Sequence, residues 1–161
     1  YKRQFMNILV SSCLLGAACK YSGKDNFCAP LAAALQAGGH VPVPVCPEVY
    51  GGLPTPRPPA ERRGDRVVTE DGADLTAQYR KGAETALLLA EAAGCRAAIL
   101  KANSPSCGCG QIYDGSFCHR KVPGDGVTAE LLRAHGLAVY DETTGPAWLT
   151  SLADRQKEGH V

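Results

Sequence analysis

The chain has 161 residues, of which 45% are hydrophobic, and its formal net charge is +1. These values predict one globular domain over residues 1–161 and argue against a broad nucleic-acid surface, which would have to neutralise many phosphates. No apolar run approaches the roughly 20 residues that cross a bilayer, so we expect no membrane partner either. Residues 1–5, before Met6, lack the apolar region of a secretion signal, and we interpret them as an expression remnant or the prelude to an alternative start.

Short apolar runs and helix signals alternate along the rest of the chain. We expect strands at 6–12, 41–45, 96–100 and 137–140, and helices at 30–36, 75–93, 127–135 and 145–157. This order predicts a three-layer, Rossmann-like α/β fold, in which a four-stranded parallel sheet is flanked by helices on both faces. The prolines of the second strand indicate a sheet position with free N–H groups. The connections 46–74 and 101–126 look irregular, and loops of this length are usually functional.

Eight cysteines stand at positions 13, 19, 28, 46, 95, 107, 109 and 118. Without a secretion signal we expect a cytoplasmic protein with reduced thiols, which points to metal or nucleophilic chemistry. Cys13, Cys46 and Cys107 follow the first three predicted strands. Because the carboxyl ends of parallel strands meet at one edge of a sheet, these three thiols should converge. Cys95 lies between a helix and an apolar strand, and we expect it in the core.

Three interpretations of the convergent cysteines are a metal or cluster site, a catalytic thiol with redox partners, and chance; their placement favours the first. Structural zinc sites usually contain Cys-x-x-Cys pairs, which this sequence lacks. A cluster on three cysteines would leave one iron open to substrate, although three cysteines do not by themselves prove iron. The alternatives are a zinc or structural cysteine-cluster binding module and a sulfurtransferase that carries persulfide on Cys107 or Cys109.

Two charged residues follow the second of these cysteines. Glu48 lies two residues beyond Cys46, where a low-dielectric site would suit it as a general acid or base; the alternative is a solvated loop glutamate. Prolines on both sides of Arg57 stiffen its loop. A rigidly held Arg57 suits recognition of phosphate or carboxylate, and the equally weighted alternative is an ion pair with Glu61 that shapes the loop.

The third cysteine follows a cation and two hydroxyls. Ser104 is placed to orient a substrate or relay a proton, and the alternative is a hydroxyl that caps a turn. Lys101 lies at the end of the third predicted strand. The chain has no Walker or dinucleotide fingerprint and no nucleophile elbow, so we expect neither nucleotide-triphosphate use nor a serine-hydrolase triad.

Six stretches of the sequence carry a family resemblance that spans Met6 to about Glu142. They are Ser11–Gly16 with Cys19 and Tyr21–Gly23, Cys46–Glu48, Gly51–Glu61, Leu100–Gly108, Ile112–Phe117 and Gly124–Thr128. Together these long motifs resemble the thiouracil desulfidase (TudS-type) family.

The resemblance implies a 4Fe–4S cluster bound by Cys13, Cys46 and Cys107, whose fourth iron has no protein ligand. It implies a non-redox desulfidase that removes sulfur from thiolated uracil compounds and releases hydrogen sulfide. Glu48 and Ser104 match the positions expected to be catalytic. We assign no chemistry to the remaining loop cysteines, which are Cys19, Cys28, Cys109 and Cys118.

The resemblance leaves the substrate open between 2-thiouracil and 4-thiouridine 5′-monophosphate. Longer relatives carry an extra domain linked to thiolated tRNA, and because the chain ends soon after its fourth predicted strand, we expect that extension to be absent. Arg57 and Lys101 offer a binding site for one phosphate, which favours the 4-thio nucleotide. Ser12 and Tyr21 complete the expected contacts with a small thiolated pyrimidine.

Overall fold

The structure, a computed structural model, describes the backbone of residues 5–158 and the side chains of residues 5–155. Its central sheet has four strands in the order β2-β1-β5-β8. They are β1 (Asn7–Ser11), β2 (Val41–Val45), β5 (Ala97–Leu100) and β8 (Ala138–Asp141). Each neighbouring pair in this sheet is parallel, so the predicted four-stranded parallel sheet is confirmed. Of the residues 1–5 set apart by the sequence, 1–4 lie outside the described part.

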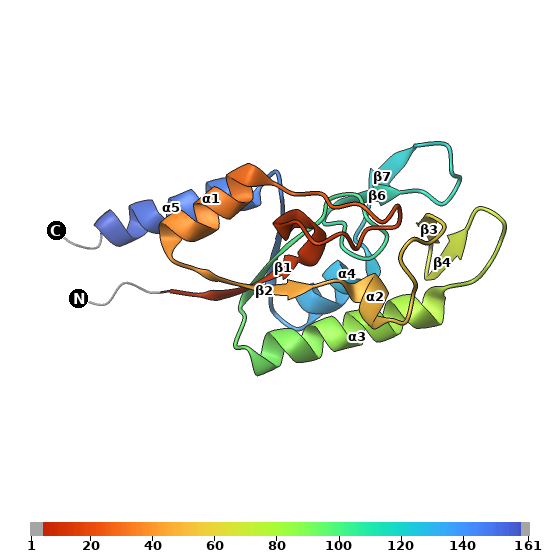
Figure 1. The fold of residues 1–161 in the computed structure, drawn as a ribbon, viewed down its shortest axis with the longest axis horizontal. Coiled ribbons are helices and arrows are strands. Elements are labelled where there is room, and N and C mark those ends of the chain that lie inside the picture. Colours follow the sequence, from red (N-terminus) through yellow and green to blue (C-terminus); the bar gives the residue numbers. More distant parts are fainter. Residues whose placement is uncertain (1–4, 159–161) are drawn as a thin grey trace.

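Helices cover both faces of the sheet, as Figure 1 shows. On one face lie α1 (Ala29–Gly38) and α5 (Gly145–Glu158), and on the other lie α3 (Thr76–Ala92) and α4 (Val127–Ala134). Side chains alternate along a strand. Ile8 and Val10 therefore pack in the core beneath α1 and α5, whereas Leu9 packs with α3 and α4. The predicted three-layer α/β fold is confirmed.

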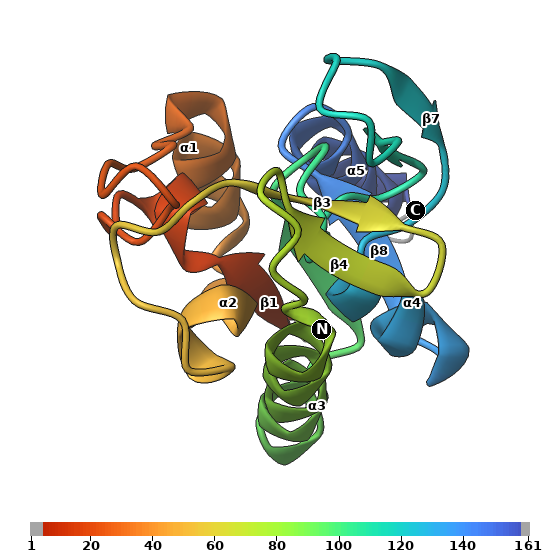
Figure 2. The same ribbon diagram turned by 90° about the vertical axis from the view of Figure 1, so that its right-hand side faces the viewer.

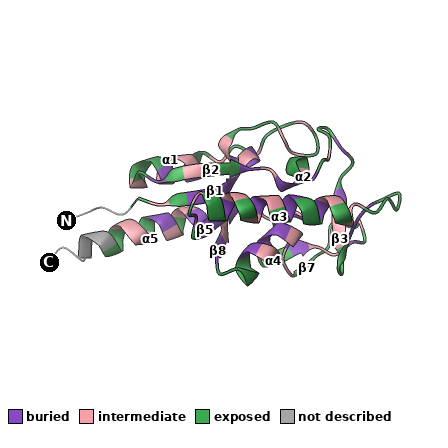
Figure 3. Cartoon of the chain, turned by 90° about the horizontal axis from the view of Figure 1, so that it is seen from below, coloured by how far each residue is buried: buried purple, intermediate pink, exposed green. Residues whose placement is uncertain are grey.

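Helix α3 illustrates how the alanine-rich sequence forms a layer. Its buried residues recur every three or four positions and form one stripe, while the intervening residues are exposed or intermediate (Figure 3). The stripe consists of Tyr79, Gly82, Ala83, Ala86 and Ala90. Within the described part of the chain, no helix has the length and apolar character needed to cross a bilayer.

The strand order places a switch point between β1 and β5, since the chain moves from β1 to β2 on one side and later adds β5 and β8 on the other. At such a point the loops after the strands diverge and leave room for a ligand. The backbone N–H of Lys101 donates to Ser11 Oγ at 2.9 Å and joins the ends of β1 and β5 there. The proline-containing β2 lies at the edge of the sheet, as predicted.

The two long connections are more ordered than the sequence suggests, so the prediction of irregular loops is wrong in part. The first contains α2 (Pro47–Tyr50) and an antiparallel hairpin of β3 (Ala60–Arg63) and β4 (Arg66–Thr69). The second contains the hairpin of β6 (Gln111–Tyr113) and β7 (Lys121–Pro123). A short 3-10 helix, Ser12–Leu15, follows β1.

The two hairpins are tied together beyond the carboxyl edge of the sheet (Figure 2). Glu61 Oε1 accepts hydrogen bonds from the backbone N–H groups of Gly115 at 3.0 Å and Phe117 at 3.2 Å. Arg63 Nη2 donates to the carbonyl oxygen of Gly115 at 2.6 Å. These contacts hold both hairpins over the switch point.

Candidate functional site

A cavity of about 480 Å³ lies at the carboxyl edge of the sheet, between the strand ends and the two hairpins. The structure brings every residue predicted to bind the metal centre or substrate, or to be catalytic, to this one cavity. Its lining includes Cys13, Cys46, Cys107, Glu48, Ser104, Arg57, Lys101, Ser12 and Tyr21. The convergence follows from the topology, because each of these residues lies in a connection that follows β1, β2 or β5. Their individual roles stay predictions.

The three cysteines come from three elements and influence one another. Cys13 lies in the 3-10 helix after β1 and Cys107 in the loop after β5, and they are only 8% and 5% exposed. Cys46 is the N-cap of α2. Burial, followed by the nearby Glu48, Cys13 and Cys46, raises the pKa of Cys107 to about 12. Deprotonating all three thiols together therefore calls for positive charge in the cavity, which a bound metal centre supplies.

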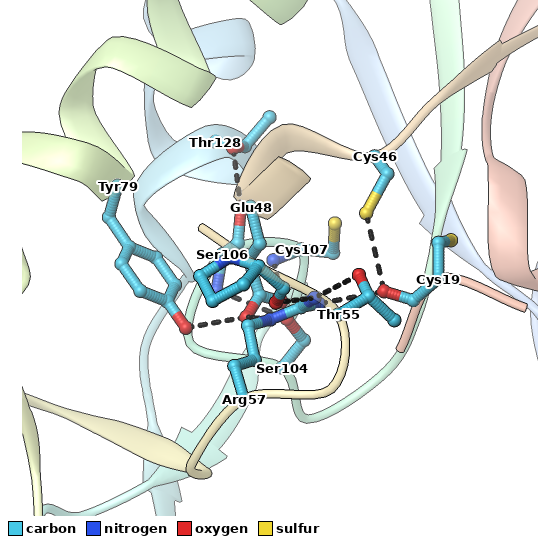
Figure 4. Close-up of polar contacts among 11 residues, drawn as sticks. Cys19, Cys46, Glu48, Thr55, Arg57, Tyr79, Ser104, Ser106, Cys107 and Thr128 are labelled. Carbon is cyan, nitrogen blue, oxygen red and sulfur yellow. Dashed lines mark hydrogen bonds and ion pairs between the residues drawn. The ribbon is translucent and has the colours of Figure 1, made fainter. Parts of the chain in front are cut away.

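Cys46 differs from its two neighbours. A hydrogen bond with the thiol of Cys19 is the largest cause that lowers the pKa of Cys46, against the effect of burial. In a separate contact, Figure 4 shows the Cys46 sulfur directed at the backbone carbonyl oxygen of Cys19, 3.8 Å away. Cys19 also lines the cavity. Sequence reasoning assigned no chemistry to this fourth cysteine, although it follows β1 in the same connection as Cys13.

The arrangement of the donors separates a cluster from a single ion. In the described part of the chain, no three His, Cys, Asp or Glu side chains are grouped closely enough to hold one metal ion. Thiolates on one zinc ion lie about 2.3 Å from the metal and hence within about 4 Å of one another. In a four-iron cluster each cysteine binds a different iron, so the sulfurs stand further apart. Three thiols around one cavity, but not around one point, fit the cluster.

Glu48 is held by two donors from different parts of the chain. Its Oε1 accepts a hydrogen bond from Tyr79 Oη at 2.6 Å and forms an ion pair with Arg57 Nε at 3.2 Å (Figure 4). The Glu48 side chain is 18% exposed, so the alternative of a solvated loop glutamate is wrong. Both donors use the same oxygen. The other oxygen, Oε2, takes part in neither contact, and Glu48 lines the cavity.

Arg57 is buried, with a side chain only 3% exposed. Besides Glu48, its guanidinium donates to the carbonyl oxygens of Pro54 and Cys19 and to Thr55 Oγ1, at 2.8–3.2 Å. The expected alternative, an ion pair between Arg57 and Glu61, is wrong, because Arg57 pairs with Glu48 instead. Glu61, although nearer in sequence, accepts hydrogen bonds from the β6–β7 hairpin. With four of its five N–H groups bonded to the protein, Arg57 connects its own loop and the loop of Cys19 to Glu48 in α2. These contacts favour a positioning role.

Lys101 is also paired. Its Nζ lies 2.9 Å from Glu142 Oε2, and Glu142 Oε1 accepts the backbone N–H of Ala102 at 2.7 Å. The two cations expected to bind a phosphate are thus each compensated by a carboxylate. Lys101 still lines the cavity and is 27% exposed in its side chain, so it remains accessible to a ligand.

Ser104 shapes the loop that carries the third cysteine. Its Oγ accepts hydrogen bonds from the backbone N–H groups of Ser106 at 3.1 Å and Cys107 at 3.0 Å. The turn-capping alternative is therefore confirmed. Because Ser104 is the acceptor in both bonds, its own hydroxyl proton is left for a ligand in the cavity, and its catalytic role stays a prediction.

Sequence reasoning missed two polar residues at the site, Tyr79 and Glu142. Tyr79 lies in the first turn of α3, and the N-terminal ends of crossover helices lie at the carboxyl edge of a parallel sheet. A tyrosine at that place in an otherwise alanine-rich helix was the available signal. Glu142 follows the fourth strand in the same way and gave a weaker signal, since loop carboxylates are common.

Comparison with known proteins agrees with this geometry. The sequence model of the 2-thiouracil desulfurase family matches residues 8–144. The uncharacterised protein YbbK of Bacillus subtilis (strain 168) is 41% identical over 145 residues, which cover 84% of this chain and 95% of YbbK. A solved structure of a [4Fe-4S]-dependent thiouracil desulfidase, TudS, superimposes with a TM-score of 0.85 at 48% identity, and the match covers 92% of this chain and 98% of TudS.

Proposed function

Because this chain belongs to the 2-thiouracil desulfurase family, we propose that it is an iron–sulfur-dependent desulfidase that removes sulfur from a thiolated uracil compound as hydrogen sulfide. The observation that carries the proposal is the convergence of three thiols from three strand ends on one cavity beside a held carboxylate. We also propose a cytoplasmic location, which the eight free cysteines support, because such thiols persist in a reducing compartment.

Cys13, Cys46 and Cys107 would hold a 4Fe–4S cluster through three of its irons. When bound, the cluster supplies an iron without a protein ligand that acts as a Lewis acid toward the thiocarbonyl sulfur. The protein's part is to keep these thiolates in place. Ser104 helps to hold Cys107 in place by capping its turn. The hydrogen bond between Lys101 and Ser11 joins the ends of β1 and β5, from which the loops that carry Cys13 and Cys107 begin.

Glu48 would act as the base. Its Oε2 accepts a proton from water as the water oxygen adds to the ring carbon that carries sulfur. The C–S bond then breaks, the carbon keeps the oxygen as a carbonyl, and both water protons leave with the sulfur as hydrogen sulfide. One proton passes through Glu48, and the Ser104 hydroxyl is placed to orient the ring or transfer the other. Carbon and sulfur keep their oxidation states, so the reaction needs no electron donor.

The burial of the thiols disfavours a persulfide-carrying sulfurtransferase. Such a carrier needs an accessible thiolate, whereas Cys107 is 5% exposed. Cys109 donates its S–H to the carbonyl oxygen of Val139 at 3.3 Å and accepts from Arg133 Nη2 at 3.1 Å, and burial raises its pKa. The desulfidase therefore accounts for these residues better.

Within this function we favour 4-thiouridine 5′-monophosphate as the substrate, with 2-thiouracil as the alternative. The cavity is within the size range of pockets that hold drug-sized ligands. Lys101 lines its wall, and Lys20 and His119 line it from the loop after β1 and the β6–β7 hairpin. Ser12 and Tyr21 would contact the pyrimidine or the ribose. A phosphate would meet the two lysines rather than Arg57, most of whose donors are bonded to the protein.

The test is sulfide release by anaerobically reconstituted protein from 4-thiouridine monophosphate, 4-thiouridine and 2-thiouracil. We expect the highest kcat/KM for the monophosphate, and a Lys101→Met variant should lower that value while leaving 2-thiouracil turnover near wild type. Equal kcat/KM values for all three compounds would remove the case for a phosphate site. No sulfide from any of them would contradict the desulfidase itself.

A further inference from the structure

Tyr79 is the one buried tyrosine among the described residues, and its hydroxyl donates a hydrogen bond to Glu48, the proposed base. The residue is 2% exposed, and its ring packs with Ala60 and Val67 beneath the β3–β4 hairpin. The 2.6 Å contact with Glu48 Oε1 crosses from α3 to α2. A core tyrosine needs some acceptor for its hydroxyl, but here that acceptor is the carboxylate that faces the cavity.

Two glycines fix the distance between the elements that carry Tyr79 and Glu48. A Cβ atom at Gly82, one turn beyond Tyr79, would overlap the carbonyl oxygen of Pro47, the residue before Glu48. A Cβ atom at Gly51, just after α2, would overlap the carbonyl oxygen of Gln78. The backbones of α2 and α3 therefore approach more closely than any side chain at these positions would allow. This contact aims the Tyr79 hydroxyl at Glu48.

Tyr79 and Arg57 are both donors to the same oxygen of Glu48. Burial is the main cause that raises the pKa of the Tyr79 phenol far above its ordinary value, so it remains a donor at any working pH. Arg57 Nε lies 3.2 Å from the same Oε1. The two donors therefore hold the carboxylate through Oε1, and neither contact uses Oε2.

We infer that Tyr79 is a positioning residue for Glu48: its hydroxyl holds Oε1 and so orients the carboxylate at the wall of the cavity. The inference rests on the proposed function, in which Glu48 accepts a proton from water. The cysteines would then determine whether the metal centre binds. Tyr79 would determine how well Glu48 acts once substrate is present.

The test is Tyr79→Phe in the iron-loaded protein, with Tyr140→Phe as the matched control, since Tyr140 stacks on Trp148 in the opposite layer. Phenylalanine keeps the ring's packing, so the variant should fold and bind the same amount of iron. We expect kcat to fall by about tenfold or more while KM changes little. Tyr140→Phe should change neither.

A double-mutant cycle in the iron-free protein reports on the contact independently of turnover. Tyr79→Phe should lower the Tm in the wild-type background and lower it less in the Glu48→Ala background, because the partner is already gone. Additive Tm changes, or an active Tyr79→Phe enzyme with wild-type kcat and KM, would overturn the inference and leave the desulfidase standing. A wild-type protein that binds iron and releases no sulfide would instead overturn the proposed function, and the inference with it.

Discussion

At the scale of single residues, the site combines a carboxylate, a guanidinium and a phenol that are each largely removed from water. Glu48, Arg57 and Tyr79 satisfy one another, and every buried side-chain nitrogen and oxygen in the described part of the chain has a hydrogen-bond partner. Removing one member of a buried charged pair leaves the other uncompensated, which costs about 3–5 kcal/mol. The substitutions that test this site should therefore preserve shape and polarity.

Glu48→Gln is such a substitution. The amide keeps an oxygen for Tyr79 and Arg57 but cannot take up a proton, so we expect turnover to fall by about 10²–10⁴-fold with iron binding unchanged. Sulfide release and iron per chain measure the two quantities. Glu70→Gln, which changes a second carboxylate in the lining of the same cavity, is the control and should retain activity. A fully active Glu48→Gln enzyme would exclude Glu48 as the base.

The cysteines give a second prediction at this scale. Alanine at Cys13, Cys46 or Cys107 should each abolish stable iron binding after anaerobic reconstitution, because a cluster left with two ligands is poorly held. Cys109→Ala and Cys118→Ala should bind iron like the wild type, since these residues lie outside the ligand set. Iron analysis per chain decides between the two groups. Retention of full iron content by any of the first three variants would remove that cysteine from the ligand set.

At the scale of elements, each end of the four central strands and of the four long helices was predictable to within two residues. Their signals are local: short apolar runs for strands and alanine-rich periodicity for α3. The short helix α2 and the two hairpins were not predictable in the same way. The β3 segment, Ala60–Arg63, carries three charged residues and no apolar alternation. It forms a strand because it pairs with β4, and its Glu61 and Arg63 side chains bond the tip of the β6–β7 hairpin.

The candidate site likewise has features that were predictable from the sequence and features that were not. The convergence of Cys13, Cys46 and Cys107 was predictable, since strand order and loop position determine it. The partner of Arg57 was not, because Glu61 is closer in sequence than Glu48 and only the tertiary fold shows which carboxylate is free. Expectations from sequence proximity fail where another element competes for the same group, as the β6–β7 hairpin does for Glu61.

The close approach of α2 and α3 yields a prediction for Gly82→Ala. Helix propensity alone would favour alanine by about 1 kcal/mol. The new Cβ would overlap the carbonyl oxygen of Pro47, so we expect a net destabilisation of about 1–3 kcal/mol. Thermal or urea unfolding of the iron-free protein measures it, with Glu84→Ala on the exposed side of the same helix as the control. A more stable Gly82→Ala protein would show that the two helices can separate without cost.

At the scale of the whole molecule, the two hairpins lie at the end of the fold opposite the start of β1 (Figure 1). The cavity is lined by residues of these hairpins and of the loops that follow β1, β2 and β5. A cluster bound there would connect loops that follow β1, β2 and β5, segments far apart in the sequence. Ligands that bind the native state and not the unfolded chain raise its stability. The single-domain organisation expected from length stays a prediction.

Iron loading should therefore raise the Tm. For a chain of this size, each kcal/mol of stabilisation corresponds to about 2–4 °C, so we expect an increase of several degrees between the iron-free and the reconstituted protein. Differential scanning fluorimetry without oxygen measures it. Cys107→Ala carried through the same reconstitution should show no increase. An equal increase in the variant would mean that iron stabilises the protein somewhere other than at the three cysteines.

The most direct test of the desulfidase proposal is a joint measurement on protein purified without oxygen: visible absorption, iron and inorganic sulfide per chain, and sulfide released from 4-thiouridine monophosphate and 2-thiouracil without any added reductant. We predict a brown protein with about four irons per chain that converts at least one of these compounds to its oxo form with equal release of hydrogen sulfide. A colourless, iron-free protein after anaerobic reconstitution, or an iron-loaded one that leaves both compounds unchanged, would contradict the account.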